Sequence, residues 1–371
     1  MWPLRSRPPL TTLQPRRICI VKPSALGDIV QSLPVLSALR ERWPDAHISW
    51  VVKECFSDLL VDHPELDEVI PFNGSARRSR FFIELARLGR VLRSRDYDLA
   101  IDLQGLLRSG AMVQATGARR RIGFSCGREG STLCYTDIVP VGPGDIPVTE
   151  RYWKVVRALG IDVDIPPVQL GLRPEHHQFA TQAVSGLDGP ILAIHPSAGW
   201  ETKRWPVHHF ERIARLAYQR HRASILLIGG KDAMPAAAQI RKSAIGPMLD
   251  LTGRTTLREL AAVISQSDVV LSGDSGPMHL AAAMETRVVS LFTCTNTIRH
   301  APYGQEHRVV ATRVSCAASH RKVCPMMDCM RELTPLRVWP MLSATLASCD
   351  LPAALPPLRP LAPVAAIADV A

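Results

Sequence analysis

The chain has 371 residues, of which 46% are apolar and 21% are charged. This composition is typical of globular proteins, and the length allows two domains that each have a core. No run of about eighteen apolar residues occurs, which argues against a membrane-spanning helix. The net charge of +10 favours polyanionic partners, whether nucleic acid, an anionic membrane or a phosphorylated substrate, and does not choose among them.

The two ends of the chain and its cysteines indicate a cytoplasmic protein. Residues 1–16 are basic but lack an apolar block, so we expect a disordered arm and no secretory signal. Residues 350–371 are rich in Pro and Ala, and we expect a disordered tail there. Nine mostly scattered cysteines fit reduced thiols better than a disulfide framework in a chain of this size.

Strands and helices alternate in the first half of the chain. An apolar run at 17–22 precedes a polar turn and then a helical spacing of Ile29, Leu33, Leu36 and Leu39. The pattern next predicts strands at 48–52, 68–72 and 99–103, an arginine-rich helix over 80–95, and another helix from 106. Such alternation is typical of a parallel, doubly wound sheet, here in an N-terminal domain at 17–175.

The same alternation restarts after a connection at 160–190 that is rich in Pro and Gly. A C-terminal domain at 185–349 is expected to contain strands at 191–195, 224–229, 248–251, 269–271 and 287–292, and helices at 207–220, 234–243, from 257, after 276, and at 335–348. The predicted fold class is therefore α/β, with two Rossmann-like, doubly wound domains that face a central cleft.

The segment 269–284, VVLSGDSGPMHLAAAM, predicts a strand, a tight polar turn and a helix. The first turn of a helix leaves backbone N–H groups without partners and carries partial positive charge, which suits a phosphate. Gly273 and Gly276 would let a phosphate approach the backbone closely. The alternative is structural: Asp274 or Ser275 caps the helix, and His279 packs in the core.

Two further residues in polar turns are candidates for chemistry. Lys203 follows a strand and a glycine-containing loop, where an ammonium group can neutralise a diphosphate; the alternative is a solvated basic loop. Asp28 lies where the first strand gives way to the first helix, where a carboxylate can act as general base for a hydroxyl nucleophile. Its alternative role is that of an N-cap, and the two roles can coexist.

Several common enzyme motifs are missing. The chain contains no G-x-G-x-x-G after the first strand of either half and no P-loop motif, which weakens dehydrogenase and NTPase interpretations. It also lacks G-x-S-x-G and H-E-x-x-H, the motifs of many hydrolases and of zinc proteases.

Four motifs in order resemble those of the ADP-heptose:lipopolysaccharide heptosyltransferases, glycosyltransferase family 9. They are KPSALGDIV at 22–30 with Leu33-Pro34, DLQGLLRS at 102–109, KRWP at 203–206 and DSGPMHLAAA at 274–283. The resemblance spans roughly residues 17–345. It implies a GT-B fold with the acceptor on the N-terminal domain and the nucleotide sugar on the C-terminal domain, and an inverting, metal-independent displacement that needs no cofactor.

The resemblance also implies residue roles. Asp28 would be the catalytic base, and Lys203 would stabilise the leaving ADP. The donor would be bound by Lys22, Ser197, Thr255, Asp274, Ser275, Gly276 and His279. A core-oligosaccharide acceptor of the Kdo-lipid A type would meet Arg77, Arg78, Arg80 and Arg120. Because that acceptor is lipid-linked, we expect peripheral contact with an anionic membrane at its cytoplasmic face.

Two features depart from the family pattern. In the family an acidic residue reaches the ribose, and here only Asp232 could take that role. FTCT at 292–295 stands where the family has a Gly-Pro-Thr turn. These differences leave the identity of the donor base and sugar open. A third feature lies outside the pattern. Cys316, His320, Cys324 and Cys329 could bind zinc, but no C-x2-C pair is present, and no metal site is predicted.

Two other functions remain open at this point. One is a GT-B glycosyltransferase that uses another nucleotide sugar or a glycan acceptor outside lipopolysaccharide. The other is a non-catalytic polyanion-binding protein. The chain contains no recognisable nucleic-acid module and only 5% aromatic residues, so no nucleic-acid partner is expected.

Overall fold

The computed structural model describes residues 7–74 and 78–349, with the backbone alone for residues 78–82. The first half of the chain forms a parallel six-stranded sheet in the order β3-β2-β1-β4-β5-β6. Its strands are β1 (Arg17–Val21), β2 (His47–Lys53), β3 (Glu68–Phe72), β4 (Leu99–Asp102), β5 (Arg120–Phe124) and β6 (Asp137–Val139).

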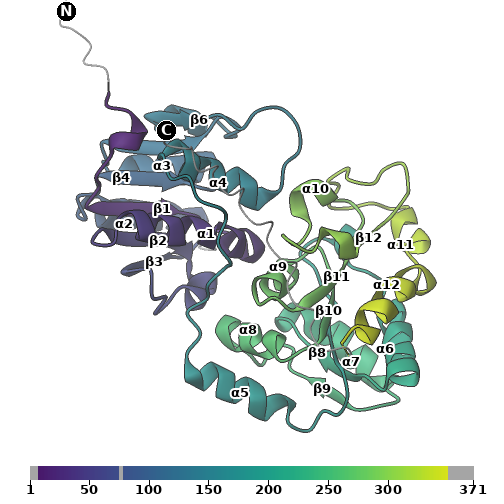
Figure 1. Ribbon diagram of the computed structural model, residues 1–371. Coiled ribbons are helices and arrows are strands. Elements are labelled where there is room, and N and C mark those ends of the chain that lie inside the picture. The colour runs from purple at the N-terminus through teal and green to yellow at the C-terminus, as the bar shows by residue number, and fades with distance from the viewer. Residues whose placement is uncertain (1–6, 75–77, 350–371) are drawn as a thin grey trace, which may run out of the picture.

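The second half repeats this topology. Its parallel six-stranded sheet has the order β12-β11-β10-β7-β8-β9, which is the order of the first sheet with each strand number raised by six. The strands are β7 (Ile191–His195), β8 (Ser224–Leu227), β9 (Met248–Asp250), β10 (Val269–Gly273), β11 (Arg287–Phe292) and β12 (Val309–Ala311). The predicted pair of doubly wound sheets is confirmed, and Figure 1 shows them as two separate bodies.

Helices cover both sheets. In the first half they are η1 (Leu10–Thr12), α1 (Leu26–Arg42), η2 (Glu54–Leu59), α2 (Arg78–Arg93), α3 (Leu107–Ala115), η3 (Ser131–Cys134) and α4 (Val148–Ala158). In the second half they are α5 (Pro174–Val184), η4 (Glu201–Lys203), α6 (Val207–His221), η5 (Lys231–Ala233), α7 (Met234–Lys242), α8 (Leu257–Ser265), α9 (Gly276–Ala283), α10 (Thr297–His300), η6 (Glu306–Arg308), α11 (Asp328–Glu332) and α12 (Pro335–Ala347).

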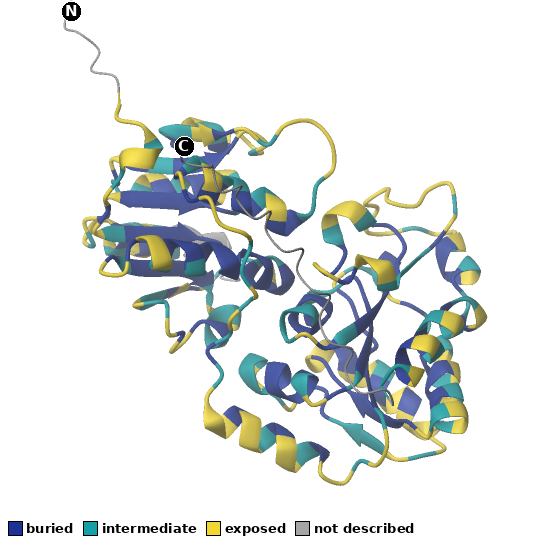
Figure 2. Ribbon diagram, in the orientation of Figure 1, coloured by how far each residue is buried: buried dark blue, intermediate teal, exposed yellow. Residues whose placement is uncertain are grey.

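The central strands are buried on both faces, as Figure 2 shows by their dark blue colour. In β1, the four residues from Ile18 to Val21 each have 0% exposure. Parallel strands with helices on both faces need apolar side chains on both. This explains why the strands appear in the sequence as continuous apolar runs rather than as alternating patterns.

The two halves touch at the N-termini of α1 and α9. The side chain of Leu26, the first residue of α1, lies less than 3 Å from the point where a Cβ on Gly276 would stand. Polar contacts also join the halves. Arg258 donates to the Asp58 carboxylate, and Asn296 donates to Asp145. The turns that follow β1 and β10 are therefore held opposite each other.

Three details differ from the sequence prediction. The connection at 160–190 contains a helix, α5, which packs against α8 of the second half. Strands β5, β6 and β12 were not among the predicted strands, and the edge strands β6 and β12 have only three residues each. Residues 7–16 are packed on the first sheet, with Arg7 donating to the Thr136 carbonyl and Arg120 to the Pro8 carbonyl. The prediction of a disordered arm is therefore wrong for residues 7–16. Residues 1–6 of the predicted arm and the predicted tail at 350–371 lie outside the described residues.

Candidate functional site

The polar turns gather at the carboxyl ends of the strands where each sheet reverses its strand order. In the first sheet this switch lies between β1 and β4, followed by Lys22 and Gln104; in the second it lies between β7 and β10, followed by Ser197 and Asp274. Open α/β sheets bind their ligands at such switch points. The two switch points face each other because the N-terminal parts of α1 and α9 pack against each other.

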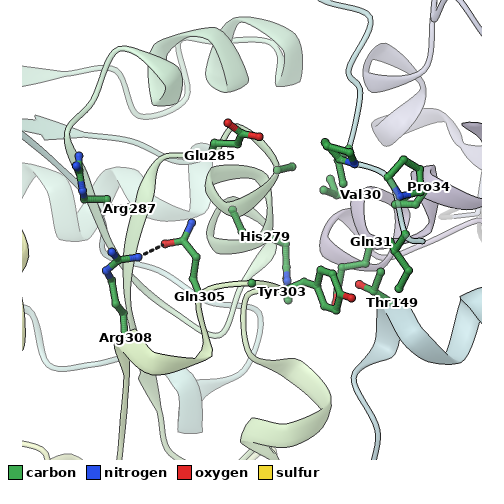
Figure 3. A pocket seen from close by; sticks show the side chains of 17 residues that line it. Val30, Gln31, Pro34, Thr149, His279, Glu285, Arg287, Tyr303, Gln305 and Arg308 are labelled. Carbon is green, nitrogen blue, oxygen red and sulfur yellow. Dashed lines mark hydrogen bonds between the residues drawn. The ribbon is translucent and has the colours of Figure 1, made fainter. Parts of the chain in front are cut away.

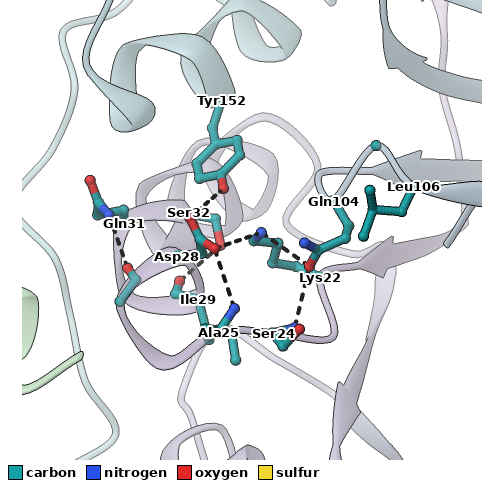
Figure 4. Close-up of polar contacts among 12 residues, drawn as sticks. Lys22, Ser24, Ala25, Asp28, Ile29, Gln31, Ser32, Gln104, Leu106 and Tyr152 are labelled. Atoms are coloured by element: carbon teal, nitrogen blue, oxygen red, sulfur yellow. Dashed lines mark hydrogen bonds and ion pairs between the residues drawn. The ribbon is translucent and has the colours of Figure 1, made fainter. Parts of the chain in front are cut away.

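Asp28 occupies the third position of α1 and points into the space between the halves. One carboxylate oxygen accepts the Tyr152 hydroxyl at 3.2 Å, and the other accepts the Ala25 backbone N–H at 3.3 Å. Its side chain is 32% exposed, so a substrate hydroxyl can reach it. Figure 4 shows the carboxylate between Tyr152 and Lys22. Asp28 is therefore not the N-cap of α1, which is Ala25; its carboxylate instead bonds the N-cap backbone N–H from the third helical position and remains accessible for proton transfer.

Lys22 lies behind Asp28 and away from solvent. Its ammonium group is 3.5 Å from the Asp28 carboxylate, 3.2 Å from the Gln104 amide oxygen and 5.3 Å from the centre of the Tyr152 ring. The residue is only 1% exposed. The structure therefore does not place Lys22 where a donor can reach it, and its ammonium instead supports the Asp28 carboxylate.

The charges around Asp28 keep it ionised. Burial raises the pKa of its carboxyl, but Lys22, the Ala25 N–H, Arg151 and His279 together lower it below its ordinary value. Burial lowers the pKa of Lys22, but Asp28 and Tyr152 outweigh that effect and the pKa is raised. At neutral pH the pair is therefore an aspartate anion and a lysine cation, and the anion can accept a proton.

Across the cleft, Lys203 pairs with Asp274. The Lys203 ammonium lies 2.6 Å from the Asp274 carboxylate, and the two side chains are 15% and 8% exposed. Burial raises the pKa of Asp274, but the electrostatic effects of Lys203 and then His279 outweigh burial, so the pKa lies below its ordinary value. The ammonium also lies 4.4 Å from the centre of the Trp200 ring. The structure thus brings together the two residues predicted to act on the donor.

The turn before α9 is built differently from the sequence interpretation. The Ser275 hydroxyl faces inward and contacts His195 Nδ1 at 3.1 Å and the Ser272 hydroxyl at 2.9 Å. A Cβ at Gly276 would meet Leu26, and a Cβ at Gly273 would meet the Lys203 carbonyl. These glycines therefore permit packing within the protein, while the N-terminal amides of the eight-residue helix α9 still offer anion-binding groups.

His279 lies between the two halves. Its ring packs on Gly27, and both Asp28 and Asp274 act on it electrostatically. Burial nevertheless lowers its pKa to about 4, so the imidazole is neutral at pH 7. Its Nδ1 atom is buried and makes no hydrogen bond to the described residues. This buried nitrogen therefore has no protein partner among the described residues, and the donor contact predicted for His279 stays a prediction.

The remaining predicted donor residues lie on the same edge of the second sheet. The Ser197 hydroxyl donates to the Asp232 carboxylate at 2.6 Å, which puts the one acidic residue considered for the ribose beside a predicted nucleotide contact. Thr255 is half-buried in the loop between β9 and α8. Ser197 and Thr255 therefore both lie on the side of the cleft predicted to bind the donor.

The arginines predicted for the acceptor are only partly placed. Arg77 lies outside the described residues, and Arg78 and Arg80 belong to α2 with only their backbone described. Arg120 begins β5, at the amino end of the sheet, opposite to the edge that carries Asp28. Its guanidinium forms two hydrogen bonds with Asp137 and one with the Pro8 carbonyl, and the residue is 8% exposed. The acceptor role of Arg120 is therefore wrong: this arginine is structural.

Two cavities adjoin these residues. A cavity of about 600 Å³ lies between the halves beside His279, with Gln31 and Thr149 on one side and Tyr303 on the other (Figure 3). A smaller one of about 240 Å³ lies at the carboxyl edge of the first sheet. Its lining includes Ser24, Gln104, Lys53, Arg108 and Glu129. The second cavity begins next to the Lys22–Asp28 pair, since Gln104 contacts both the Lys22 ammonium and the Ser24 N–H.

Four residues of the site were not predicted. Tyr152 and Arg151 both come from α4 and act on Asp28. Tyr152 is 124 positions from Asp28 in the chain. Trp200 contacts the Lys203 ammonium, and His300 is placed near Asp274 and His279. No local pattern marks Tyr152 or His300, whereas Trp200 lies three residues before the KRWP motif and could have been considered with it.

Two structural findings concern a metal and a membrane. Among the described residues, no group of three or more His, Cys, Asp or Glu side chains is arranged to hold a metal ion; Cys316 is exposed and Cys329 is buried. None of the helices in the described ranges has both the length and the apolar character required to cross a bilayer.

The sequence and the fold can be compared with known proteins. A model of glycosyltransferase family 9 (heptosyltransferase) matches residues 85–330. The chain belongs to this family. The predicted family and the prediction of a glycosyltransferase are therefore confirmed. All four motifs that suggested the family lie on the cleft, in the turns after β1, β4, β7 and β10.

Individual relatives of this family 9 enzyme align over most of their length. The lipopolysaccharide heptosyltransferase 1 of Pseudomonas aeruginosa is 28% identical over 360 residues, which cover 89% of this chain and 98% of the relative. The lipopolysaccharide core heptosyltransferase OpsX of Haemophilus influenzae is 26% identical over 309 residues, covering 82% and 86%. The structure of Escherichia coli heptosyltransferase WaaC with ADP-2-deoxy-2-fluoro heptose is 24% identical, with a TM-score of 0.66, covering 88% and 99%. That likeness supports the GT-B fold.

Proposed function

We propose that this enzyme transfers heptose from ADP-heptose to an inner-core lipopolysaccharide acceptor of the Kdo-lipid A type, with inversion at the anomeric carbon. The observation that carries the proposal is the opposition of the Asp28 carboxylate and the Lys203–Asp274 pair across one cleft. The names of the two curated relatives support lipopolysaccharide as the acceptor class, and the ligand of the WaaC structure supports ADP-heptose as the donor class.

In the proposed reaction the Asp28 carboxylate removes the proton from an acceptor hydroxyl. The oxygen then forms a bond to the anomeric carbon from the face opposite the ADP, and the bond between that carbon and the diphosphate oxygen breaks. The electron pair leaves with ADP, and the proton remains on Asp28. Opposite-face attack in one step gives inversion, and it requires one base and one group that stabilises the leaving charge.

The leaving diphosphate would be stabilised by the Lys203 ammonium and by the backbone amides at the start of α9. These groups can do the work that a divalent cation does in other transferases, and this supports our proposal that the reaction is metal-independent. Asp274 would orient the Lys203 ammonium and contact the donor sugar. Assay of transfer in the presence of excess chelator should show unchanged turnover.

We place the anionic part of the acceptor in the cavity of about 240 Å³ that begins at Ser24 and Gln104, next to the Lys22–Asp28 pair. Two basic side chains, Lys53 at the end of β2 and Arg108 in the first turn of α3, line it. A carboxylate or phosphate of the acceptor would be attracted to these cations. The same acceptor would bring the enzyme to an anionic membrane surface, and flotation with anionic liposomes, compared with neutral ones, tests that contact.

Donor identity is tested by calorimetric titration with ADP, UDP and GDP, followed by transfer assays with ADP-heptose and a Kdo-lipid A acceptor. We expect ADP to bind most tightly and radiolabelled heptose to appear on the acceptor. Tighter binding of UDP or GDP would overturn the heptose assignment in favour of another nucleotide sugar. ADP binding without transfer to that acceptor would instead point to a different glycan.

A further inference from the structure

A second lysine shares the aromatic ring that contacts Lys203. The Trp200 ring has the Lys203 ammonium at 4.4 Å from its centre and the Lys322 ammonium at 5.2 Å. Trp200 belongs to the loop after β7, whereas Lys322 lies 122 positions further on, in the segment between β12 and α11. A cation is attracted to the face of an indole ring. Two cations at one ring, however, repel each other, and an anion that binds both would relieve that repulsion.

The backbone around Lys322 is anchored to the donor side of the cleft. The Thr202 hydroxyl, next to Lys203, donates to the Arg321 carbonyl at 2.6 Å. The His320 N–H donates to the Cys294 carbonyl at 2.7 Å, just after β11. These bonds fix the backbone on the N-terminal side of Lys322, while its own side chain stays exposed. The position of this lysine is thus set by the elements that carry the donor site.

The charge balance of the site favours a second cation. The Lys203 charge is already balanced by the Asp274 carboxylate at 2.6 Å. The terminal diphosphate of ADP carries more than one negative charge, which this neutral pair cannot compensate alone. Lys322 forms no ion pair with any carboxylate in the part of the chain that the structure describes. Its charge is therefore available to a ligand.

We propose that Lys322 is a second cationic ligand of the donor β-phosphate, and that Trp200 is a positioning residue that holds both ammonium groups toward it. The inference rests on the proposed ADP-sugar site and adds a residue from a segment that none of the four sequence motifs includes. A bound diphosphate would lie between Lys203 and Lys322, on the same side as the amides of α9.

The test is calorimetric titration of the full chain with ADP and with AMP, which lacks the β-phosphate. Lys322→Ala should weaken ADP binding by about three- to tenfold, the effect of one partly exposed charge-assisted contact, and leave AMP binding within about twofold of wild type. Lys322→Arg should retain most of the ADP affinity, since it keeps the charge. Lys242→Ala, at an exposed lysine of α7, is the matched control and should change neither.

A double-mutant cycle tests the role of Trp200. Trp200→Leu should weaken ADP binding in the wild-type chain and have a smaller effect in the Lys322→Ala chain, because the part of its effect that acts through Lys322 is already lost there. Equal loss of ADP and AMP binding in Lys322→Ala, or no loss of either, would overturn the proposal. If the wild-type chain binds UDP in place of ADP, the donor assignment fails. The role of Lys322 is then tested separately, by comparing how Lys322→Ala changes the binding of UDP and of UMP. Absence of any nucleotide binding by the wild-type chain overturns both.

Discussion

His279 and Gly27 join the two halves of the enzyme by direct contact: the imidazole Cδ2 atom lies 2.3 Å from the point where a Cβ on Gly27 would stand. Gly27 immediately precedes the proposed base, and His279 lies in the first turn of the helix proposed to bind the diphosphate. This contact between the two halves therefore lies next to both the proposed base and the proposed leaving-group site.

This contact predicts the outcome of Gly27→Ala. A methyl group at this position overlaps the imidazole, so either α1 or His279 must move, and the separation of Asp28 from the donor changes. We expect a loss of at least about tenfold in kcat, since displacements of about 1 Å can cost a hundredfold. The melting temperature should change little, because the core of each half is untouched.

A second variant identifies His279 as the cause. In the His279→Ala background the added methyl group has room, so Gly27→Ala should cost less than it does in the wild-type chain. Steady-state kinetics of the four proteins in this cycle measure the coupling. If the two single effects simply add, the clash with His279 is not the reason for the loss.

Removal of the proposed base should separate chemistry from donor binding. Asp28→Asn preserves shape and the capping of Ala25 but cannot accept a proton. We expect kcat to fall by about 10²- to 10⁴-fold, the usual contribution of a general base. ADP affinity should stay near wild type because the donor residues lie on the other half. Rapid-quench transfer assays and calorimetry measure the two quantities, and retained turnover would exclude Asp28 as the base.

Lys22 controls the pH at which Asp28 becomes protonated. The pKa of Asp28 is lowered, against the effect of burial, by Lys22 first and then by the Ala25 N–H. Since the base must be ionised, kcat/KM should remain constant as pH falls to the ordinary aspartate range, and should decline only below it. Lys22→Met removes the main lowering influence while burial persists. The acidic limb of the kcat/KM profile should therefore move to higher pH.

The control for this shift is Lys242→Met, which leaves the surroundings of Asp28 unchanged and should leave the profile unchanged. The acidic limb of Lys22→Met would stay at the wild-type pH if Lys22 did not act on Asp28 through charge. A lower kcat at all pH values without a displaced limb would indicate a purely structural role for this lysine.

The strand and turn positions of the site could be predicted from sequence, because buried parallel strands appear as apolar runs and the polar turns follow them directly. Asp28, Lys203 and Asp274 were found in this way. The burial of Lys22 could not be predicted, since the ring that covers it belongs to Tyr152 of a distant helix. Similarly, the sequence identifies Gly276 as a small residue but does not show that Leu26 of the other half occupies the space beside it.

Arg120 illustrates a different limit of sequence prediction. Its residue type suits an anionic acceptor, but its position at the first residue of β5 puts it at the amino edge of the sheet. Which edge of the sheet a residue reaches depends on where the strand begins, and strand boundaries are the least reliable part of a pattern-based prediction. The basic residues at the carboxyl edge, Lys53 and Arg108, stand out only when the cavity is visible.

This difference between the two edges of the sheet predicts opposite phenotypes. Arg120→Ala leaves Asp137 at 15% exposure without its two hydrogen bonds from the guanidinium, and should lower the free energy of unfolding by about 3 kcal/mol without changing KM for the acceptor. Lys53→Ala should instead raise acceptor KM about three- to tenfold, as expected for loss of one partly exposed charged contact, with little effect on stability. Denaturant unfolding measures the stability of both variants, and steady-state kinetics measure their KM for the acceptor. A raised acceptor KM in Arg120→Ala with unchanged stability would return Arg120 to the acceptor site, and an unchanged KM in Lys53→Ala would remove Lys53 from it.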